Sequence, residues 1–573
     1  MAVEKRNRRF FDYPDYRNVR DLMVATCKRF SENTAFIIKE KGDESINYIN
    51  IKFDRLLQDI YNFGQGLFNL GLKGKRIAVV SKNRYEWVIT YFATLFGGGV
   101  IVPLDKGLPA DELENCILRS EADAIVFDNA QLDLIEKVKE NGKSQLRNYI
   151  CMEKNDKYED IYQLIEKGKE LRGKGINDIE DVKIDENALC ELTFTSGTSA
   201  ESKIVMLSQR NIAFDVDRLN LVEDFRATDV NLAFLPYHHA LGSTSIPFIL
   251  SYGAATAFPD GLRYIQQNMK EYGVSVFIGV PLLIEAMYKK VYKEIQKKKM
   301  EKKVYALRKI TNICPKLKRK VFKSVIDGLG GKLRLIISGA AALDQEVWEG
   351  FNEMGIIIRQ GYGLSECAPV VSGENVKYER KNSIGLPLPD IEVKVFDKNE
   401  QGIGELAVKG ENVMLGYYKN DEANKEAFRD GYFMTGDIGY VDRDGFVFIT
   451  GRKKSVIVLK NGKNIYPEEI EALINKIPLV KESMVYGAPK DDDVLLSVKV
   501  QIDKDYVAEN LRDMSEEEIK KMIWDNIKEI NRTMPTYKYV KHMITTYDDF
   551  EKTTTQKIKR YIEIQKILES EKE

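Results

Sequence analysis

The sequence predicts an α/β protein with a large amino-terminal part of helix-covered, mainly parallel β-sheet, then a small β-barrel, then a small α+β unit. Three observations predict this order. Short apolar runs alternate with helical segments between residues 76 and 359, glycine turns separate short strands between 391 and 450, and strands mix with helices after 466. Strands that alternate with helices pair in parallel, because each connection crosses over the sheet. The 573 residues exceed what one core organises.

Residues 1–70 are interpreted as an entry segment whose last part, 54–70, has a helical pattern ending at Gly71, a plausible helix cap. The alternation then begins. Its strands are 76–80, 100–103 and 124–127, and its helices are 85–96 and 110–119. Residues 155–185 are charged and weakly patterned, which predicts a helix and a surface connection.

The alternation resumes after this connection. The predicted strands are 188–194, 204–207, 231–235, 275–278, 333–337 and 355–359. A helical region over 282–326 is broken near Pro315, and residues 289–334 are strongly basic. We favour a solvated helical face for the basic region, and the alternative is peripheral contact with anionic lipid or with the phosphates of an acyl carrier.

From residue 391 the pattern changes to short strands between glycine turns, which is typical of a small barrel. These strands are 391–396, 404–408 and 445–450, with a helix at 419–428. The tail then has helices at 467–474 and 516–529 and strands at 483–486, 494–502 and 541–545. Such a tail of about 120 residues has the size of an ordinary domain.

Composition excludes several classes of protein. Lys and Arg number 87 against 88 Asp and Glu, so no global field favours nucleic acid. The six cysteines form no CxxC pair, which argues against a zinc site or disulfide framework and fits a reducing compartment. The amino terminus is basic without an apolar core, and the longest apolar runs are too short to span a bilayer. We therefore expect a cytoplasmic protein.

A hydroxyl-rich loop, residues 193–203, follows the apolar run 188–194 and ends in Lys203. Backbone N–H groups, hydroxyls and a lysine are suited to gripping phosphate. The P-loop template fits poorly, because Ser202 replaces its second glycine and Ile204 replaces its Mg²⁺-binding hydroxyl. The alternative interpretation, an ordinary polar loop between two strands with no phosphate-binding role, stays open on these residues alone.

Several further motifs occur in a fixed order along the chain. They are residues 195–203, 235–242, 338–342, 360–366, 404–418, 432–437, 451–471 and 552–560. In these motifs the chain resembles the adenylate-forming superfamily of acyl-CoA synthetases, luciferases and peptide adenylation domains. The resemblance implies a core of two helix-covered sheets plus the barrel over residues 1–451 (barrel about 385–450) and a mobile domain over 452–573. It also implies that a carboxylate attacks ATP to give an acyl-adenylate and pyrophosphate, and that a thiol then gives a thioester and AMP.

The resemblance assigns the nucleotide site. The matching phosphate loop should hold the β- and γ-phosphates through Thr195, Ser196, Gly197, Thr198 and Lys203. The loop departs from the family at Ala200, Ser202 and Ile204, where glycine, proline and glycine are usual, and this stiffens it. The adenine and ribose contacts should come from Gly339, Ala340, Tyr362, Gly363, Ser365, Asp437 and Arg452. Tyr362 should stack on adenine, and Asp437 should bind the ribose hydroxyls with support from Arg452.

The resemblance also implies a metal site and mobile catalytic groups. Glu366 should bind Mg²⁺, together with Thr198; one carboxylate and substrate phosphates suit that cation. Lys454 matches the hinge, and Gly462 matches the backbone that lines the pantetheine tunnel. Lys557 matches the lysine that orients the carboxylate, although Gln556 replaces the usual glycine before it.

The expected substrate is a medium- or long-chain fatty acid, with CoA as acceptor. Residues 237–242 contain no acid that would hold an α-amino group, and the resemblance implies that His239 lies beside the acyl and thiol channel. The basic insertion 287–328 resembles that of long-chain fatty acyl-CoA synthetases. An acyl-carrier protein as acceptor and an aryl acid as substrate stay open. A degenerate nucleotide- or acyl-binding protein is the non-enzyme alternative, motivated by Ala200, Ile204 and Gln556.

Overall fold

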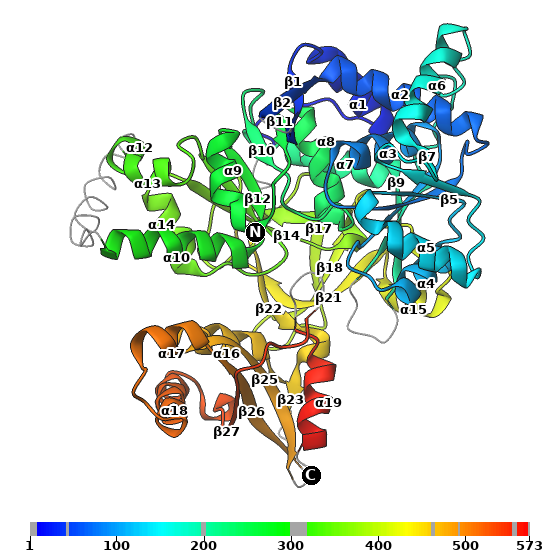
Figure 1. Cartoon of the computed structure of the whole chain (residues 1–573). Helices are drawn as coiled ribbons and strands as arrows, with labels where there is room; N and C mark the ends of the chain where they lie inside the picture. Colours follow the sequence, from blue (N-terminus) through cyan, green and yellow to red (C-terminus); the bar gives the residue numbers. More distant parts are fainter. Residues whose placement is uncertain are drawn as a thin grey trace.

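The computed structural model describes residues 8–41, 45–195, 202–297, 318–459, 464–490, 493–552 and 558–570. A larger part contains two extended sheets with helices around and between them (Figure 1). The carboxyl-terminal part, orange to red in Figure 1, lies below it and is reached through β22. This is the predicted α/β class with a small carboxyl-terminal α+β unit.

The first sheet has nine strands in the order β16-β15-β14-β13-β12-β10-β11-β1-β2. The strands from β14 to β1 pair in parallel, and antiparallel strands complete both edges. The strands are β1 (Thr34–Lys41), β2 (Ile46–Lys52), β10 (Val230–Leu232), β11 (Ala255–Ala257), β12 (Val276–Gly279), β13 (Leu335–Ser338), β14 (Ile357–Gly363), β15 (Val370–Gly373) and β16 (Leu386–Pro387). The helices connected with it are α8 (Ala240–Ser251), α9 (Ile265–Glu271), α10 (Pro281–Lys297), α12 (Lys318–Val321), α13 (Lys323–Gly328) and α14 (Gln345–Glu353).

The second sheet has eight strands in the order β19-β9-β8-β4-β3-β5-β6-β7, parallel from β8 to β7. The strands are β3 (Arg76–Val80), β4 (Val100–Leu104), β5 (Ala124–Phe127), β6 (Asn148–Cys151), β7 (Glu159–Asp160), β8 (Leu189–Phe194), β9 (Ile204–Ser208) and β19 (Gly416–Tyr417). The helices on this side are α1 (Val19–Arg29), α2 (Phe53–Asn69), α3 (Tyr85–Phe96), α4 (Ala110–Ser120), α5 (Leu132–Asn141), α6 (Ile161–Gly173) and α7 (Gln209–Asn220).

The largest core cluster lies between these two sheets and includes side chains of α1, α2, α3, α7 and α8. All twelve residues of α3 are buried. A helix with almost no charged residues has no face for water, so it fits only between two packed layers. The two sheets and the helices between them therefore share one core, which fixes their carboxyl edges relative to each other.

The small β unit follows as a five-stranded antiparallel sheet. Its strands are β17 (Glu392–Phe396), β18 (Gly404–Lys409), β20 (Phe428–Arg429), β21 (Tyr432–Val441) and β22 (Val447–Arg452), with α15 (Asp421–Ala427) beside it. The carboxyl-terminal part has its own core over a three-stranded sheet. Its elements are β23 (Ile457–Val458), β24 (Asn464–Ile465), α16 (Pro467–Ile474), β25 (Val480–Lys490), β26 (Asp493–Ile502), α17 (Lys504–Asn510), α18 (Glu516–Arg532), β27 (His542–Thr546) and α19 (Arg560–Ser570).

The structure adds detail at two places where the sequence pattern was weak. Residues 1–70 were interpreted as an entry segment with one helix, but they also supply α1 and the antiparallel pair β1–β2 at the edge of the nine-stranded sheet. The strand expected at 355–359 is Ile357–Gly363, so Tyr362 lies on a strand.

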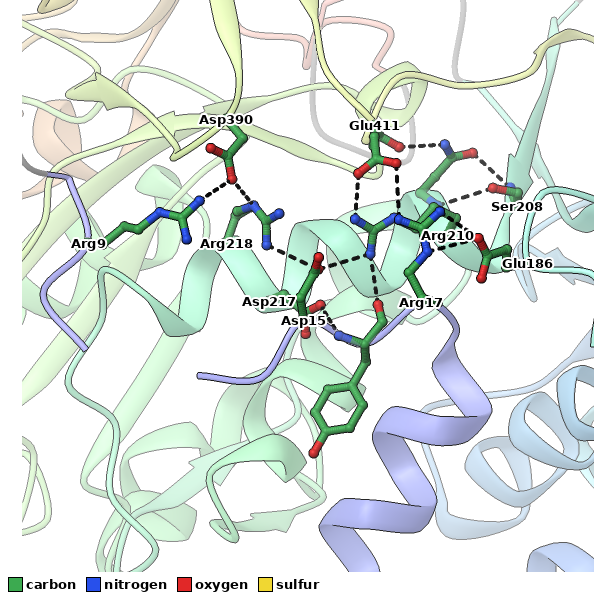
Figure 2. Close-up of polar contacts among 12 residues, drawn as sticks. Arg9, Asp15, Arg17, Glu186, Ser208, Arg210, Asp217, Arg218, Asp390 and Glu411 are labelled. Atoms are coloured by element: carbon green, nitrogen blue, oxygen red, sulfur yellow. Dashed lines mark hydrogen bonds and ion pairs between the residues drawn. The ribbon is translucent and has the colours of Figure 1, made fainter. Parts of the chain in front are cut away.

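An extended amino-terminal strap, residues 8–17, crosses the outside of α7 (Figure 2). Phe10 N donates to Leu221 O at 2.8 Å, and Arg9 pairs with Asp390 at 2.7 Å. Arg210, which is buried, pairs with Asp15 at 3.1 Å and with Glu411 at 2.5 Å. The strap thus joins α7 to the loops at residues 390 and 411, which lead toward the candidate site.

Candidate active site

The phosphate-loop motif lies between β8 and β9, which pair antiparallel. Thr195 N donates to Lys203 O at 2.9 Å, and Thr195 Oγ1 donates to the same carbonyl at 3.2 Å. Both ends of the loop are therefore held together at the carboxyl end of β8. Ser196, Gly197 and Thr198 lie outside the described residues, as do Ala200 and Glu201.

Lys203 and Glu366 both contact the side chain of Tyr417. Lys203 Nζ lies 4.4 Å from the centroid of the tyrosine ring, and the Tyr417 hydroxyl donates to Glu366 Oε1 at 2.8 Å. Glu366 is in a short 3-10 turn, Ser365–Cys367, directly after β14. The lysine and carboxylate that the sequence assigned to phosphate and metal are thus brought to one place, although 163 positions separate them in the sequence.

A second group joins Tyr362, Asp437 and Arg452. The Tyr362 hydroxyl donates to Asp437 Oδ2 at 2.6 Å, and Arg452 Nε lies 2.8 Å from Asp437 Oδ1. Asp437 and Arg452 face each other on the neighbouring strands β21 and β22. Burial, together with the Asp437 carboxylate, raises the pKa of Tyr362, so its hydroxyl stays a donor. Asp437 itself is 3% exposed.

Glycine is required at Gly363, because a Cβ there would lie 1.9 Å from Pro369 O. Gly339 follows β13, and a Cβ on it would lie 3.2 Å from Leu241 Cδ2 on α8. Ala340 has φ of 73°, in the left-handed region that non-glycine residues rarely adopt. The backbone at these positions passes close to its neighbours at the carboxyl ends of parallel strands, where α/β sheets bind ligands.

His239 is the amino-terminal cap residue of α8, and its ring centroid lies 4.1 Å from that of His238. His238 Nε2 lies 3.5 Å from Asp105 Oδ2, which follows β4 in the other sheet. Burial lowers the pKa of His238, Asp105 opposes this shift, and Lys106 adds to it. The first turn of α8 therefore lies where the two sheets meet.

Lys454 lies in a 3-10 turn, Lys453–Ser455, immediately after β22. Its neighbour Lys453 pairs with Glu405 at 2.6 Å on the five-stranded sheet. Gly462 and Lys557 fall outside the described residues. Lys454 therefore lies between β22 and β23, and the roles of all three residues stay predictions.

The family model for AMP-binding enzymes matches residues 24–418, and the model for the carboxyl-terminal domain of AMP-binding enzymes matches residues 454–569. The first match alone covers more than half of the chain. The chain belongs to the AMP-binding enzyme family. The resemblance seen in the motifs is confirmed.

Named relatives of this AMP-binding enzyme span most of its length. Fatty acyl-CoA synthetase B of Dictyostelium discoideum is 30% identical over 512 residues, covering 82% of this chain and 74% of that protein. A chloroplastic long-chain-fatty-acid–[acyl-carrier-protein] ligase of Arabidopsis thaliana is 26% identical over 551 residues, covering 82% and 75%. The crystal structure of an anthranilate CoA ligase in complex with anthranoyl-AMP has a TM-score of 0.75 at 20% identity, over 97% of this chain and 98% of that one. That last likeness supports the fold.

Two residues of this AMP-binding enzyme contact the site but were not singled out in the sequence. Tyr417 lies inside the motif 404–418, but only its spatial contacts mark it. Arg119, at the end of α4, donates from Nη2 to Ser202 O at 2.6 Å and so holds the carboxyl end of the phosphate loop. Neither contact follows from local periodicity, because each joins segments far apart in the chain.

Among the described residues, no helix is long and apolar enough to cross a membrane. Also within those residues, no group of three or more His, Cys, Asp or Glu side chains could hold a metal ion.

Proposed function

We propose that the chain is an ATP-dependent, AMP-forming fatty-acid–CoA ligase. The observation that carries this proposal is the arrangement of Lys203, Tyr417 and Glu366 in a chain of the AMP-binding family whose relatives include a fatty acyl-CoA synthetase. A medium- or long-chain carboxylate attacks the α-phosphate of ATP, the acyl–O–P bond forms, and pyrophosphate leaves. The CoA thiol then attacks the acyl carbonyl, and AMP leaves.

In this proposal the protein positions charge and does little covalent chemistry. Lys203 and the loop residues Thr195, Ser196, Gly197 and Thr198 bind the β- and γ-phosphates. Asp437 accepts from the ribose hydroxyls, and its contacts with Tyr362 and Arg452 hold its carboxylate in place. Tyr362 presents its ring to adenine between Gly361 and Gly363.

Glu366 is the proposed Mg²⁺ ligand, with Thr198 as a further oxygen donor. The Glu366 side chain is partly exposed and offers hard oxygen atoms, which fits a cation that keeps several waters. Bound Mg²⁺ would neutralise charge on the phosphates during the displacement. The turn Ser365–Cys367 fixes the direction in which the carboxylate points.

The acid is proposed to be an alkyl acid. The segment 236–242 contains two histidines and no carboxylate that could hold an amino group. Leu241 packs toward Gly339, whose backbone we propose to contact the nucleotide. Apolar surface therefore lies near the proposed position of the acid's carboxylate. Apolar walls with few polar groups suit an alkyl chain. His239 is proposed to face the acyl and thiol channel from the start of α8.

An acyl-carrier protein is the second candidate acceptor. The relative from Arabidopsis thaliana is named as a ligase for that acceptor. A carrier presents the same phosphopantetheine thiol as CoA. The basic region 289–334 is proposed to contact the phosphates of such a carrier or the headgroups of anionic lipid.

The domain boundary is also a proposal. We place it at residues 451 and 452, with Lys454 at the hinge and Gly462 and Lys557 on the mobile part. The two family models leave residues 419–453 between them, which supports a junction near this point.

The test measures carboxylate-dependent release of pyrophosphate in the presence of Mg²⁺ and ATP. The acids range from acetate to palmitate and include one aryl acid. Each acid is assayed with CoA, with a carrier protein and without an acceptor. Release that peaks with long alkyl acids and accelerates with CoA supports the proposal. Acceleration by the carrier protein but not by CoA assigns the second acceptor. Absence of release with every acid would favour a nucleotide-binding protein without turnover.

A further inference from the structure

The side chain of Tyr417 separates two groups of opposite charge. Its ring lies against Lys203 Nζ and its hydroxyl donates to Glu366 Oε1. Tyr417 is 6% exposed, so the ring fills this space. Among the described residues, Lys203 and Glu366 form no ion pair of 4 Å or less, although both contact the same tyrosine.

The backbone of Tyr417 is held by strand pairing and by the side chain of Asn424. It pairs with Val205 in the antiparallel ladder of β19 and β9, two residues after Lys203. Tyr417 N donates to Asn424 Oδ1 at 2.6 Å, and Asn424 Nδ2 donates to Tyr417 O at 2.9 Å. Gly416, with φ of 136°, sets the chain direction just before it. The backbone of Tyr417 is therefore fixed against β9, the strand that begins directly after Lys203.

The segment before Tyr417 also holds the backbone around Glu366. Met414 N donates to Glu366 O at 2.8 Å. Asn412 Nδ2 donates to Cys367 O at 3.0 Å, and Asn412 is fully buried. One short segment, residues 412–417, thus contacts both the backbone and the carboxylate of this turn.

We propose that Tyr417 is a positioning residue that keeps Lys203 and Glu366 apart and aimed at Mg²⁺ and ATP. The inference rests on the function proposed above. A direct ion pair between the two groups would use the charge that each needs for phosphate or metal. The ring attracts the ammonium without neutralising it. One O–H donated to a carboxylate leaves other acceptor positions for a cation.

The two parts of the side chain have separable effects. Tyr417→Phe keeps the ring as a spacer and removes the hydrogen bond to Glu366. Tyr417→Leu removes both, so Lys203 and Glu366 can approach each other. Tyr418 provides the matched control: its hydroxyl lies 2.7 Å from Arg76 Nη1 and 2.7 Å from Glu121 Oε2.

The first experiment measures the distance between the charged groups without any nucleotide. A zero-length carbodiimide cross-linker joins a lysine to a carboxylate only where they pair, and mass spectrometry detects the joined peptides. We expect a Lys203–Glu366 cross-link in Tyr417→Leu, and none in wild type, Tyr417→Phe or Tyr418→Leu. An equal yield in all four proteins would overturn the spacer role, whatever reaction the protein catalyses.

The second experiment measures equilibrium binding by calorimetry with a non-hydrolysable ATP analogue, with Mg²⁺ and with a chelator. Tyr417→Phe should weaken binding about tenfold with Mg²⁺ and little with chelator, because it loses one hydrogen bond to a charged group. Tyr417→Leu should weaken both, and adding Glu366→Gln should restore binding in chelator. Unchanged affinities in both variants would overturn the proposal, and a wild type that binds no analogue would overturn the proposed function instead.

Discussion

At the scale of single residues, the proposed nucleotide site contains one buried carboxylate that two neighbours hold. Asp437 receives the Tyr362 hydroxyl on one oxygen and Arg452 on the other. Asp437→Asn keeps the shape but removes the charge. We expect the ATP concentration for half-maximal pyrophosphate release to rise by about tenfold, with little change in the fatty-acid requirement. A steady-state titration of each substrate measures this, and an equal rise for both substrates would contradict a ribose role.

Asp217 gives a prediction for stability against pH. Burial, with Asp15 close by, raises the pKa of Asp217 to about 8, while Arg218 and the N–H of Tyr16 oppose the shift. In the folded protein the Asp217 carboxyl therefore keeps its proton up to about pH 8. In the unfolded chain the same carboxyl releases its proton above its ordinary pKa near 4. The contribution of Asp217 to the free energy of unfolding should fall as pH rises from about 4 to about 8 and should stay constant above that pH.

Asp217→Asn tests this sign, because the amide imitates the protonated acid and cannot ionise. The melting temperature of the variant relative to wild type should increase between pH 5 and pH 8.5. Asp390→Asn serves as control, since that carboxylate is partly exposed and pairs with Arg9 and Arg218. A difference for Asp217→Asn that does not change with pH would show that this carboxyl is ionised in the folded protein.

The candidate site was predictable in its residue types but only partly in its contacts. The motifs identified Lys203, Glu366, Asp437 and Arg452, and the structure brings them into two groups. Tyr417 was not identified, because a tyrosine on a short strand has no distinctive spacing. Its role is visible only where β19 pairs with β9 and the turn after β14 meets them both.

At the scale of elements, the strap and α7 both contact Glu411 (Figure 2), which precedes Tyr417 in the same segment of the chain. Arg210 is 2% exposed and donates to Asp15, Glu411 and the carbonyl of Tyr16. Arg210→Ala should lower the free energy of unfolding by about 2–4 kcal/mol, because several buried hydrogen bonds to one charge are lost together. Chemical denaturation of the purified protein measures the change.

Arg17→Ala is the matched control. Arg17 also pairs with Glu411 and with Glu186, but about half of its side chain is exposed, so its loss should cost less than about 1 kcal/mol. If the two variants lost the same stability, the buried network around Arg210 would not be what holds the strap.

Many elements between residues 76 and 260 and after 466 were predicted, because each carries its own apolar period, but α5, β6, α7, α8 and β11 were not. Several predicted bounds, including those of Arg76–Val80, Tyr85–Phe96 and Pro467–Ile474, agree with the structure. The pair β1–β2 was not predicted. The apolar residues of β2, Ile46, Tyr48, Ile49 and Ile51, do not alternate regularly, and all seven residues of the strand are at least partly exposed, so its place comes from pairing with β1.

At the scale of the whole molecule, the carboxyl-terminal part has a core of its own, and exposed ion pairs are among its contacts with the larger part. Lys476 lies 3.8 Å from Asp344, and Lys293 lies 3.6 Å from Glu509. All four side chains are at least partly exposed, so these pairs stabilise one arrangement only weakly. Such weak pairs are compatible with the domain rotation that we propose between the two half-reactions.

Replacing Lys557 should affect the two half-reactions differently. If Lys557 enters the site only for adenylation, Lys557→Ala should lower acyl-adenylate formation by several orders of magnitude and leave thioester formation from supplied acyl-AMP and CoA nearly unchanged. The reason is that the lysine offsets charge on the α-phosphate, which the second step no longer needs. Pyrophosphate release and single-turnover thioester formation measure the two rates, with Lys559→Ala as control. An equal loss of both rates in Lys557→Ala would mean that the lysine serves one fixed arrangement, and the hinge at Lys454 would then lose its proposed purpose.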